Sequence, residues 1–528
     1  GLPMVWLDGE GRAFNGLVIT ASNCAVYGLV IKSFGGHGVY LYGGAQRNRI
    51  GGTGTHQRVV ISGNGWDGVM ITGSATTSNT VEAAYIGTDP EGKPSTGITD
   101  WSNRRHGVSI WYGGSNAISG NLIADNDWSG VAVDYARSTE IRNNRIGLSV
   151  DGQPLGNGFY GIHIANGAMP VVISNTIAFN RRGIHIEGGA QPVISENTIY
   201  SNTASTLATP RGGGIAARDA PPIIVGNIIT GNYGCVACSG AQGRGGGIYL
   251  FNVPATAVIS GNLIAHNVAA SGTVGWGGGI YLEDASPRVL SNTIQGNRAG
   301  QSAGNGGGIA VVEGSPLIAD NHILQNVAGQ GVMGHGGGIF VQSSSPVTIE
   351  RNRIELNAAL RGTASPGLFS RGGGLFFDGP VALIRDNRVE GNVAALLDQR
   401  GLGGGMYLHG LSAAAVVRGN VIANNNRASH VANGDGGGLY LVGCYATVAD
   451  NQVSNNIASS ETPGYGGGLY VKNGGGLIQG NVITNNMAVL GAESGWGWGG
   501  GMAISGSAVL VQDNLIAQNI ANSAPNAR

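Results

Sequence analysis

Apolar and polar residues alternate in short runs along almost the whole chain, and Gly, Asn and Ser-Pro turns separate the runs. The stretch 277–297 shows the pattern, with Ile-Tyr-Leu after three glycines, then Val-Leu, then Thr-Ile between two asparagines. Alternation over such short runs is typical of strands, and no helical period accompanies it. The pattern predicts three short strands per coil, with Ile280, Leu282, Val289 and Ile294 pointing into the core.

This coil repeats at a nearly fixed interval. Gly-Gly-Gly followed by an apolar residue occurs ten times in register, at intervals of 29 to 36 residues. A period of this length is typical of a solenoid, in which each coil packs on the next. The triplets begin at Gly212, Gly245, Gly277, Gly306, Gly336, Gly372, Gly403, Gly436, Gly466 and Gly499.

Two asparagines, five residues apart, follow every triplet. Asparagine tolerates a left-handed backbone, and its amide both donates and accepts. We therefore expect each asparagine to bond to its equivalent one coil away, so that the side chains form a structural ladder. The first members of the pairs are Asn227, Asn262, Asn292, Asn321, Asn352, Asn387, Asn420, Asn451, Asn481 and Asn514.

The N-terminal third repeats the same pattern in shorter coils, for example Gly-Val-Tyr-Leu at 38–41 and Gly-Ile-His-Ile at 183–186. We expect a single domain over 1–528, with shorter, less regular coils in 1–202 and ten regular coils with long connectors in 203–528. About sixteen coils at the spacing between strands would give a rod about 75 to 80 Å long.

These repeats resemble the right-handed parallel β-helix repeat family, the pectate-lyase-like superfamily, over nearly the whole chain. The Gly-Gly-Gly-Ile and Asn-x-Ile-x-x-Asn motifs are also similar to the repeats of the chlamydial polymorphic outer-membrane adhesins. The resemblance implies an all-β, right-handed parallel β-helix from a secreted or cell-surface protein. Fold alone does not define function.

Composition and charge exclude several classes of partner. Charged residues make up 11% of the chain and the formal net charge is -1, so nothing attracts nucleic acid. No apolar run approaches the roughly 20 residues that cross a bilayer.

Cys24 and Cys444 are expected to be buried and unpaired, whereas the spacing of Cys235 and Cys238 permits a small disulfide loop, half of a zinc site or neither. No cofactor and no metal site are expected.

The outward position on the strand after each triplet carries an aromatic residue in seven of nine coils. One interpretation is that the rings stack on one another under the long connectors. The other is an exposed stripe that contacts sugars or a neighbouring subunit. The aromatic members of this stripe are Tyr249, Tyr281, Phe340, Phe376, Tyr407, Tyr440 and Tyr470. Trp66, Trp128, Trp496 and Trp498 lie in turns, where an indole could also stack on a sugar.

A polar face replaces the aromatic column in the N-terminal third. Within four consecutive coils it gathers His163, His185, Asp134, Glu187 and Arg218. Such a set could perform acid–base chemistry on an acidic polysaccharide, as in a polysaccharide lyase or a glycoside hydrolase. Exposed residues of these types on a solenoid are also commonly only solvated, so the question of enzyme activity stays open.

The first and last residues belong to coils that no capping element covers. Unpaired strand edges need a cover, so we expect missing flanking sequence, other domains or another copy at the ends, and the chain to be a fragment of a longer one. The leading hypothesis is an extracellular or cell-surface structural or adhesive β-helix that contacts glycans or other copies of itself and assembles into a fibre or surface layer. The alternative is a lyase or hydrolase acting on an acidic polysaccharide.

Overall fold

The computed structural model describes residues 5–95, 100–204, 211–236, 242–362, 368–396, 400–429, 433–461, 463–491 and 496–524. Strands and turns account for these residues, and no α-helix occurs among them. The chain divides into two compact units. Unit 1 comprises Gly1–Thr206 and Gly213–Asn232, and unit 2 comprises Leu207–Gly212 and Tyr233–Arg528. The single domain expected from the sequence stays a prediction.

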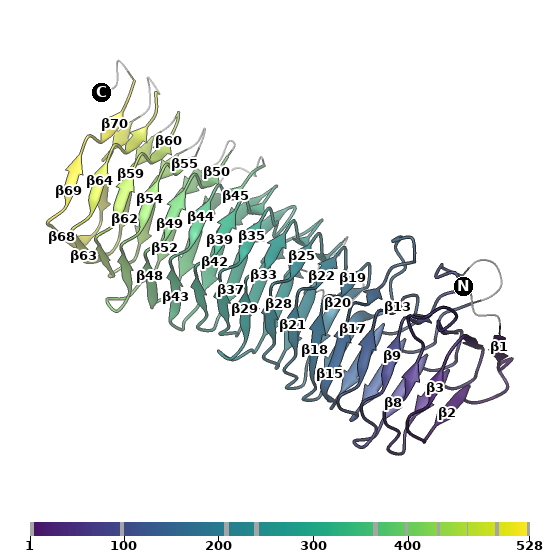
Figure 1. Ribbon diagram of the computed structural model, residues 1–528. Helices are drawn as coiled ribbons and strands as arrows, with labels where there is room; N and C mark the ends of the chain where they lie inside the picture. The colour runs from purple at the N-terminus through teal and green to yellow at the C-terminus, as the bar shows by residue number, and fades with distance from the viewer. Residues whose placement is uncertain are drawn as a thin grey trace. The chain divides into compact units, whose positions relative to one another are not determined.

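Unit 1 winds through three parallel sheets, to which each complete coil contributes one strand per sheet (Figure 1). Sheet A runs from β1 (Val5–Asp8) to β25 (Ile228–Thr230), and sheet C from β3 (Ala25–Val26) to β24 (Ile223–Val225). Sheet B carries the candidate site. Its described strands in unit 1 are β2 (Leu17–Ile19), β5 (Val39–Leu41), β8 (Val69–Thr72), β11 (Val108–Trp111), β14 (Val131–Asp134), β17 (Tyr160–Ala165), β20 (Arg182–Ile186) and β23 (Ile215–Arg218).

Unit 2 also winds through three parallel sheets, which are given the same letters. Within unit 2, sheet A runs from β30 (Leu263–Ala265) to β69 (Leu515–Ala517), and sheet C from β29 (Val258–Ser260) to β68 (Ala508–Gln512). The described strands of its sheet B are β28 (Ile248–Phe251), β33 (Ile280–Glu283), β37 (Ile309–Val312), β42 (Ile339–Gln342), β47 (Leu375–Asp378), β52 (Met406–His409), β57 (Leu439–Val442), β62 (Leu469–Lys472) and β67 (Met502–Ser505).

The predicted fold is confirmed in both units. Neighbouring coils pair in parallel and in register, as Ile280 with Ile309 and Leu282 with Val311 show. The four predicted core residues, Ile280, Leu282, Val289 and Ile294, are fully buried. Stacked apolar columns of this kind supply the main stabilising term of a solenoid, because each coil buries its inward side chains against the coils on both sides.

Buried asparagines form hydrogen-bonded ladders along both units. In unit 2, Asn292 Nδ2 donates to Asn321 Oδ1 at 3.0 Å, and Asn321 Nδ2 donates to Asn352 Oδ1 at 3.0 Å. Asn292 Nδ2 also donates to the carbonyl of Ile259 at 2.9 Å. Within its own coil, Asn321 Nδ2 donates to the carbonyl of Ala319 at 2.9 Å. These amides therefore satisfy polar groups of their own coil and of the coils beside it, at the point where the strand bends.

The left-handed backbone lies one residue before the position expected from the sequence. Ser291, with φ 53°, precedes Asn292, and Asp320, with φ 59°, precedes Asn321. The ladder asparagines themselves are not among the described residues with positive φ. Asparagine is thus selected here for its amide, and the residue before it makes the turn.

The glycine triplets are required by close backbone approach. Gly277 has φ 62°, in the region that favours glycine. A Cβ on Gly278 would lie 2.5 Å from the carbonyl carbon of Arg298, which belongs to a connector, and a Cβ on Gly279 would lie 2.7 Å from the carbonyl oxygen of Gly308 in the next coil. The first glycine is therefore required by its backbone conformation, the second by the close approach of the connector, and the third by the close approach of the next coil.

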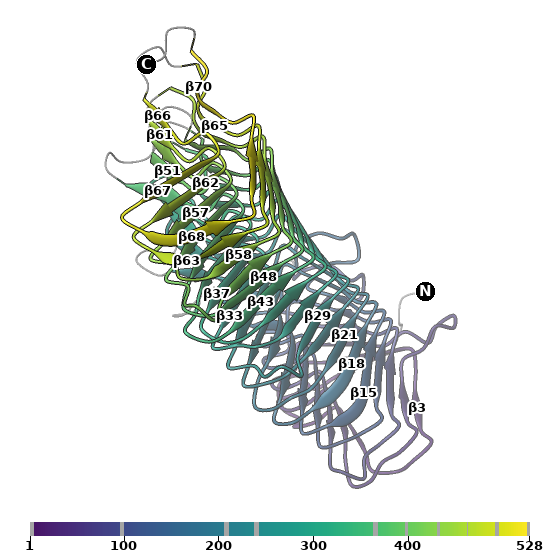
Figure 2. The ribbon, with the colours of Figure 1, turned by 90° about the vertical axis from the view of Figure 1, so that its left-hand side faces the viewer.

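The long connectors of unit 2 form two further parallel sheets. One includes β40 (Val327–Gly329), β45 (Ala358–Leu360) and β50 (Val393–Ala395). The other, here the cover sheet, lies beside sheet B, as β51, β61 and β66 next to β57, β62 and β67 show (Figure 2). Its described strands are β27 (Gly243–Arg244), β32 (Gly275–Trp276), β36 (Ala303–Asn305), β41 (Met333–His335), β46 (Phe369–Arg371), β51 (Arg400–Leu402), β56 (Gly434–Asp435), β61 (Gly464–Tyr465) and β66 (Gly497–Trp498).

The cover sheet buries the aromatic stripe, so the prediction of an exposed contact surface is wrong. The seven rings, from Tyr249 to Tyr470, are only 2 to 7% exposed. Residues of the cover sheet pack on them: Trp276 lies edge-on to Phe340 with centroids 5.5 Å apart, and Tyr465 stacks on Tyr470 at 5.6 Å. The connectors thus protect apolar rings that would otherwise face water. The interpretation that the rings stack beneath the connectors describes the structure.

The cysteines meet the expectations only in part. Cys24 and Cys444 are both free, but only Cys444 is buried, because Cys24 lies near the edge of unit 1 and is half-buried. Cys235 ends β26 (Tyr233–Cys235), is buried and is disulfide-bonded. Cys238, its predicted partner, lies outside the described residues. Over the described residues, no helix has the length and apolar character needed to cross a membrane.

Candidate functional site

A cavity of about 640 Å³ opens on the outer face of sheet B in unit 1. Two sets of residues build it: the outward side chains of the strands, and the residues of the turn that precedes each strand. Glycine at the start of each strand brings these turns close together. A Cβ on Gly107, for example, would lie 2.7 Å from the carbonyl oxygen of Gly130 in the next coil. The bulky turn residues of successive coils therefore stand side by side as one wall.

The lining combines aromatic rings with charged and polar groups. Small outward residues such as Ser109 leave room between larger ones, and the turns supply most of the indoles and imidazoles. The aromatic residues that line the cavity are Tyr40, Trp66, Trp111, Trp128, Phe159 and Tyr160, and the polar or titratable ones are His37, Asp67, Thr72, Arg105, His106, Ser109, Ser129, Asp134 and His163.

Arg105 is held between two indoles of this wall. Its guanidinium lies 4.8 Å from the ring centroid of Trp66 and 5.4 Å from that of Trp128. Cation–π contacts of this kind fix the direction of a side chain that would otherwise be mobile. The cavity therefore carries a permanent positive charge at a defined place.

Hydrogen bonds and close contacts within the turns fix the orientation of His106 and His37. The backbone N–H of Ser129 donates to His106 Nδ1 at 3.2 Å, which leaves the proton of the neutral ring on Nε2. Burial lowers the pKa of His106, so this ring is neutral at neutral pH. Asp67 accepts from the backbone N–H of His106 at 3.0 Å and lies 3.2 Å from His37 Nδ1.

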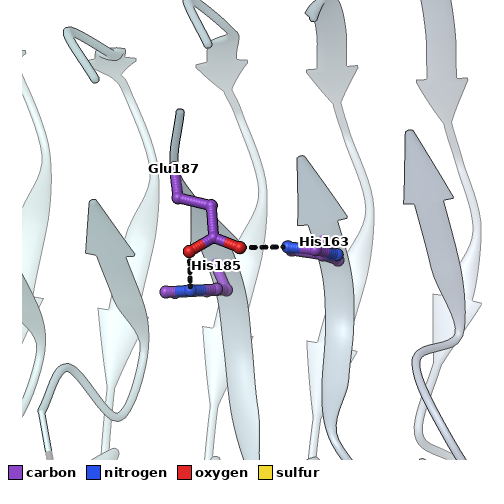
Figure 3. A group of neighbouring side chains, drawn as sticks. All are labelled: His163, His185 and Glu187. Carbon is purple, nitrogen blue, oxygen red and sulfur yellow. Dashed lines mark hydrogen bonds and ion pairs between the residues drawn. The ribbon is translucent and has the colours of Figure 1, made fainter. Parts of the chain in front are cut away.

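His163, His185 and Glu187 form a compact cluster at one end of the cavity, with His163 in its wall (Figure 3). His163 on β17 and His185 on β20 are register partners, and their ring planes are 12° apart. Glu187 follows β20 directly. Its two carboxylate oxygens lie 3.1 Å from His163 Nε2 and 3.4 Å from His185 Nε2.

Arg182 fixes the tautomer of His185. Arg182 Nη1 lies 3.0 Å from His185 Nδ1, and because a guanidinium only donates, Nδ1 must accept. The ring proton then sits on Nε2 and points at Glu187. Burial, with the charge of Arg182 adding to it, lowers the pKa of His185 to about 4. Hydrogen bonds from His163 and then His185 hold the pKa of Glu187 well below its ordinary value, so the carboxylate stays ionised.

The structure brings together three of the five residues expected to act as a group. Asp134 belongs to the cavity but not to the cluster, and its Oδ1 accepts from Asn166 Nδ2 at 2.8 Å. Arg218 pairs with its neighbour Asp219 at 3.2 Å. Its participation with the two histidines stays a prediction.

Sequence reasoning missed most of the cavity wall. The sequence does contain a pattern that marks this wall: the residue just before the glycine that begins each strand of sheet B is polar or aromatic. In successive coils these residues are His37, Asp67, His106, Ser129, Tyr160 and Arg182. Among them, Tyr160 contacts both rings of the cluster, with centroids 5.4 Å from His163 and 4.7 Å from His185. Chemically, the arrangement can bind a polar ligand that has apolar faces, and the cluster can exchange a proton or coordinate a cation.

Comparison with known proteins identifies the fold. The family model described as right handed beta helix region matches residues 154–328 and 302–524, more than half of the chain. The model of NosD, described as a periplasmic copper-binding protein, matches residues 46–233. No curated protein matches the sequence.

Solved structures with a similar fold are distant. A mutant of the periplasmic alginate epimerase AlgG is 10% identical, with a TM-score of 0.36 over 84% of this chain and 78% of its own. DFA-IIIase from Arthrobacter chlorophenolicus is 14% identical, with a TM-score of 0.29 over 64% and 88%. The Dettilon tailspike protein is 15% identical, with a TM-score of 0.27 over 77% and 59%. On the strength of the family model, the chain belongs to the right-handed β-helix family.

Proposed function

We propose that unit 1 binds a glycan in the cavity on sheet B, outside the cytoplasm. The observation that carries the proposal is the lining, in which Trp66, Trp111 and Trp128 stand among hydrogen-bonding side chains and one fixed guanidinium. The apolar face of a sugar ring packs on an indole, while its hydroxyl groups need donors and acceptors at the edge. About 640 Å³ accommodates a ligand of a few sugar rings.

Binding of a panel of neutral and acidic oligosaccharides to the purified protein tests this proposal. We expect at least one of them to bind, and Trp128→Ala to weaken that binding tenfold or more, because one stacked aromatic contact contributes about 1–3 kcal/mol. Trp496→Ala is the matched control, since that indole is 66% exposed and belongs to unit 2. Equal losses in both variants, or no loss in Trp128→Ala, would refute binding in the cavity.

A second candidate is turnover of the glycan by a polysaccharide lyase or a glycoside hydrolase. The observation that favours it is that Asp134 and His163, two groups able to exchange protons, both line the cavity. Release of reducing ends or of unsaturated products from an acidic polysaccharide measures this activity. Binding without product in long incubations would leave the cavity as a recognition site only.

Within the leading proposal, unit 2 is a structural extension that presents the cavity at a cell surface. Because the aromatic stripe is buried, it offers no rings for lateral contacts between copies. Assembly of copies into a fibre or layer stays a prediction. Negative-stain electron microscopy over a dilution series tests it, because assembly depends on concentration and isolated particles at every dilution would contradict it.

The NosD match bears on a different ligand. Its description names copper, and the matched range 46–233 contains His163, His185 and Glu187 and all of the cavity lining except His37 and Tyr40. Imidazole nitrogen and carboxylate oxygen are both acceptable to copper. The match is therefore compatible with a metal ion at the cluster as well as with a glycan in the cavity.

A further inference from the structure

We infer that His163, His185 and Glu187 form a site for a divalent transition-metal ion, Cu²⁺ or Zn²⁺, and that Arg182 restrains the site from binding it. This inference does not depend on glycan binding. Its first support is the donor set. One atom from each of the three side chains can be chosen so that all lie within 4.8 Å of one another, and this is the one such group among the residues that the structure describes.

The separations between the carboxylate of Glu187 and each imidazole suit an ion of this class. Bonds of about 2.0 to 2.2 Å to nitrogen and oxygen place neighbouring ligand atoms about 3.0 to 3.5 Å apart. The two separations from the imidazole nitrogens to the Glu187 oxygens, 3.1 and 3.4 Å, fall in this range. An ion would take the place of the two protons that now lie between the rings and the carboxylate. Two imidazoles and one carboxylate favour Cu²⁺ and Zn²⁺ over Ca²⁺ or Mg²⁺, which prefer oxygen donors.

The cluster is also accessible. The side chain of Glu187 is 44% exposed and that of His163 is 20% exposed, and His163 faces the cavity. An ion can therefore enter from solvent, and water can occupy the coordination positions that the protein leaves open. The three ligands come from strands and from a turn held by backbone pairing, so little ordering is needed on binding.

Arg182 opposes the ion in two ways. A histidine that binds a metal through Nε2 normally donates from Nδ1, but here Nδ1 must accept from the guanidinium at 3.0 Å. Metal at Nε2 therefore requires a proton on Nδ1 and withdrawal of Arg182. In addition, the guanidinium is a buried positive charge beside the site, 5.4 Å from the ring centroid of Tyr160. Arg182 is thus a restraint on affinity and not a ligand.

Arg182→Gln is the informative variant. It removes the charge and offers a carbonyl oxygen that can accept from His185 Nδ1, which is the arrangement that metal-bound histidines use. Titration of the full chain with Cu²⁺, followed by calorimetry and electron paramagnetic resonance, is expected to show one ion per chain with imidazole nitrogen coupling. Zn²⁺ should bind at the same site and compete with Cu²⁺ only in excess, because nitrogen and oxygen donors bind Cu²⁺ more tightly. In Arg182→Gln we expect binding at least tenfold tighter.

His163→Ala and Glu187→Gln are expected to abolish or strongly weaken the same signal. His322→Ala is the matched control, because His322 Nε2 also lies close to a carboxylate, Glu355 Oε2 at 3.3 Å, but has no second imidazole there. Circular dichroism shows whether each variant is folded. Cu²⁺ binding that survives both cluster variants would overturn the site assignment. Binding seen only after Arg182 is replaced would overturn it for the natural protein, and unchanged affinity in Arg182→Gln would overturn the restraint.

Discussion

Phe340 and Phe376 stack in neighbouring coils of unit 2 with ring planes 2° apart and centroids 4.8 Å apart. The separation equals the spacing between strands, so the backbone of the solenoid sets the stacking distance. His335 of the cover sheet also stacks on Phe376, with centroids 5.4 Å apart. The stripe is therefore the core between two sheets, and its residues are expected to affect stability and not recognition.

Phe376→Ala should destabilise unit 2 by about 3–5 kcal/mol, because it leaves a cavity between sheet B and the cover sheet. The measurement is urea unfolding followed by circular dichroism. Tyr445→Ala serves as the control, since that ring is 57% exposed and its loss should change stability little. Glycan binding should be retained in both variants. Loss of glycan binding without loss of stability in Phe376→Ala would restore the stripe as a contact surface.

Gly278→Ala should prevent normal folding of its coil. The added Cβ would lie 2.5 Å from the carbonyl carbon of Arg298 and from the carbonyl oxygen of Gly307, and backbone atoms of adjacent coils cannot move independently. Gly272→Ala is the matched control in the connector of the preceding coil, because a Cβ there meets nothing within 4 Å and φ is not positive. Soluble yield and thermal unfolding compare the two. Similar behaviour would show that the triplets are not required sterically.

Asp125 should make the stability of unit 1 depend on pH. Burial, followed by the charges of Asp100 and Asp127, raises the pKa of Asp125 to about 6. The folded state then holds this proton more tightly than the unfolded state, in which the pKa is near 3.8. Stability contributed by the protonated form is present below about pH 4 and is lost as the pH rises through about 6.

Asp125→Asn replaces the carboxyl group with an uncharged amide, and asparagine tolerates the left-handed backbone at this position, where φ is 57°. We expect the variant and the natural protein to melt at similar temperatures at pH 4, and the variant to melt higher at pH 7. Thermal unfolding from pH 4 to pH 7 measures the difference. A constant offset across this range would show that Asp125 titrates normally.

Arg105→Met should discriminate between acidic and neutral glycans. The guanidinium between Trp66 and Trp128 can form a charge-assisted hydrogen bond with a sugar carboxylate, worth about 1.5–3 kcal/mol. Methionine keeps an apolar side chain in the same place. Affinity for an acidic oligosaccharide should fall about tenfold or more, while affinity for a neutral one should change little.

Arg104→Met is the control for this experiment. Arg104 is adjacent in sequence, but its guanidinium pairs with Asp100 at 3.0 Å and with Asp127 at 3.5 Å, and it does not line the cavity. Its replacement should leave both affinities unchanged. Equal loss for acidic and neutral ligands in Arg105→Met would mean that the arginine only supports the indoles.

The backbone path could be predicted from the sequence because each coil repeats its own constraints. Ile280 and Val289 recur as apolar positions, and the triplet beginning at Gly277 marks the same turn each time. The cover sheet could not be predicted in this way. Its strands, such as β61 (Gly464–Tyr465), span two or three residues, and their register comes from the coils beneath them and not from an alternating pattern of their own.

The part of the site that could be predicted from the sequence is the set of side chains at equivalent positions of neighbouring coils. His163 and His185 share a column, so their proximity follows from the spacing of the coils. The contact of Arg182 Nη1 with His185 Nδ1 depends on the rotamer of Arg182, and the pair of Arg218 with Asp219 depends on the rotamer of Arg218. The sequence does not specify these rotamers. The cavity arises where small outward residues, such as Ser109, lie between larger ones, a contrast in size that polarity alone does not reveal.

The asparagine ladders have a consequence for how such a protein can change in length. Asn321 accepts from Asn292 one coil earlier and donates to Asn352 one coil later. Each ladder asparagine therefore needs only another asparagine at the equivalent position of the neighbouring coil. The number of coils before or after it does not affect these hydrogen bonds. Deleting or duplicating one whole coil of unit 2 would leave every remaining amide with an equivalent partner. Duplication of a gene segment could thus alter the reach of the molecule in steps of one coil without requiring any compensating substitution.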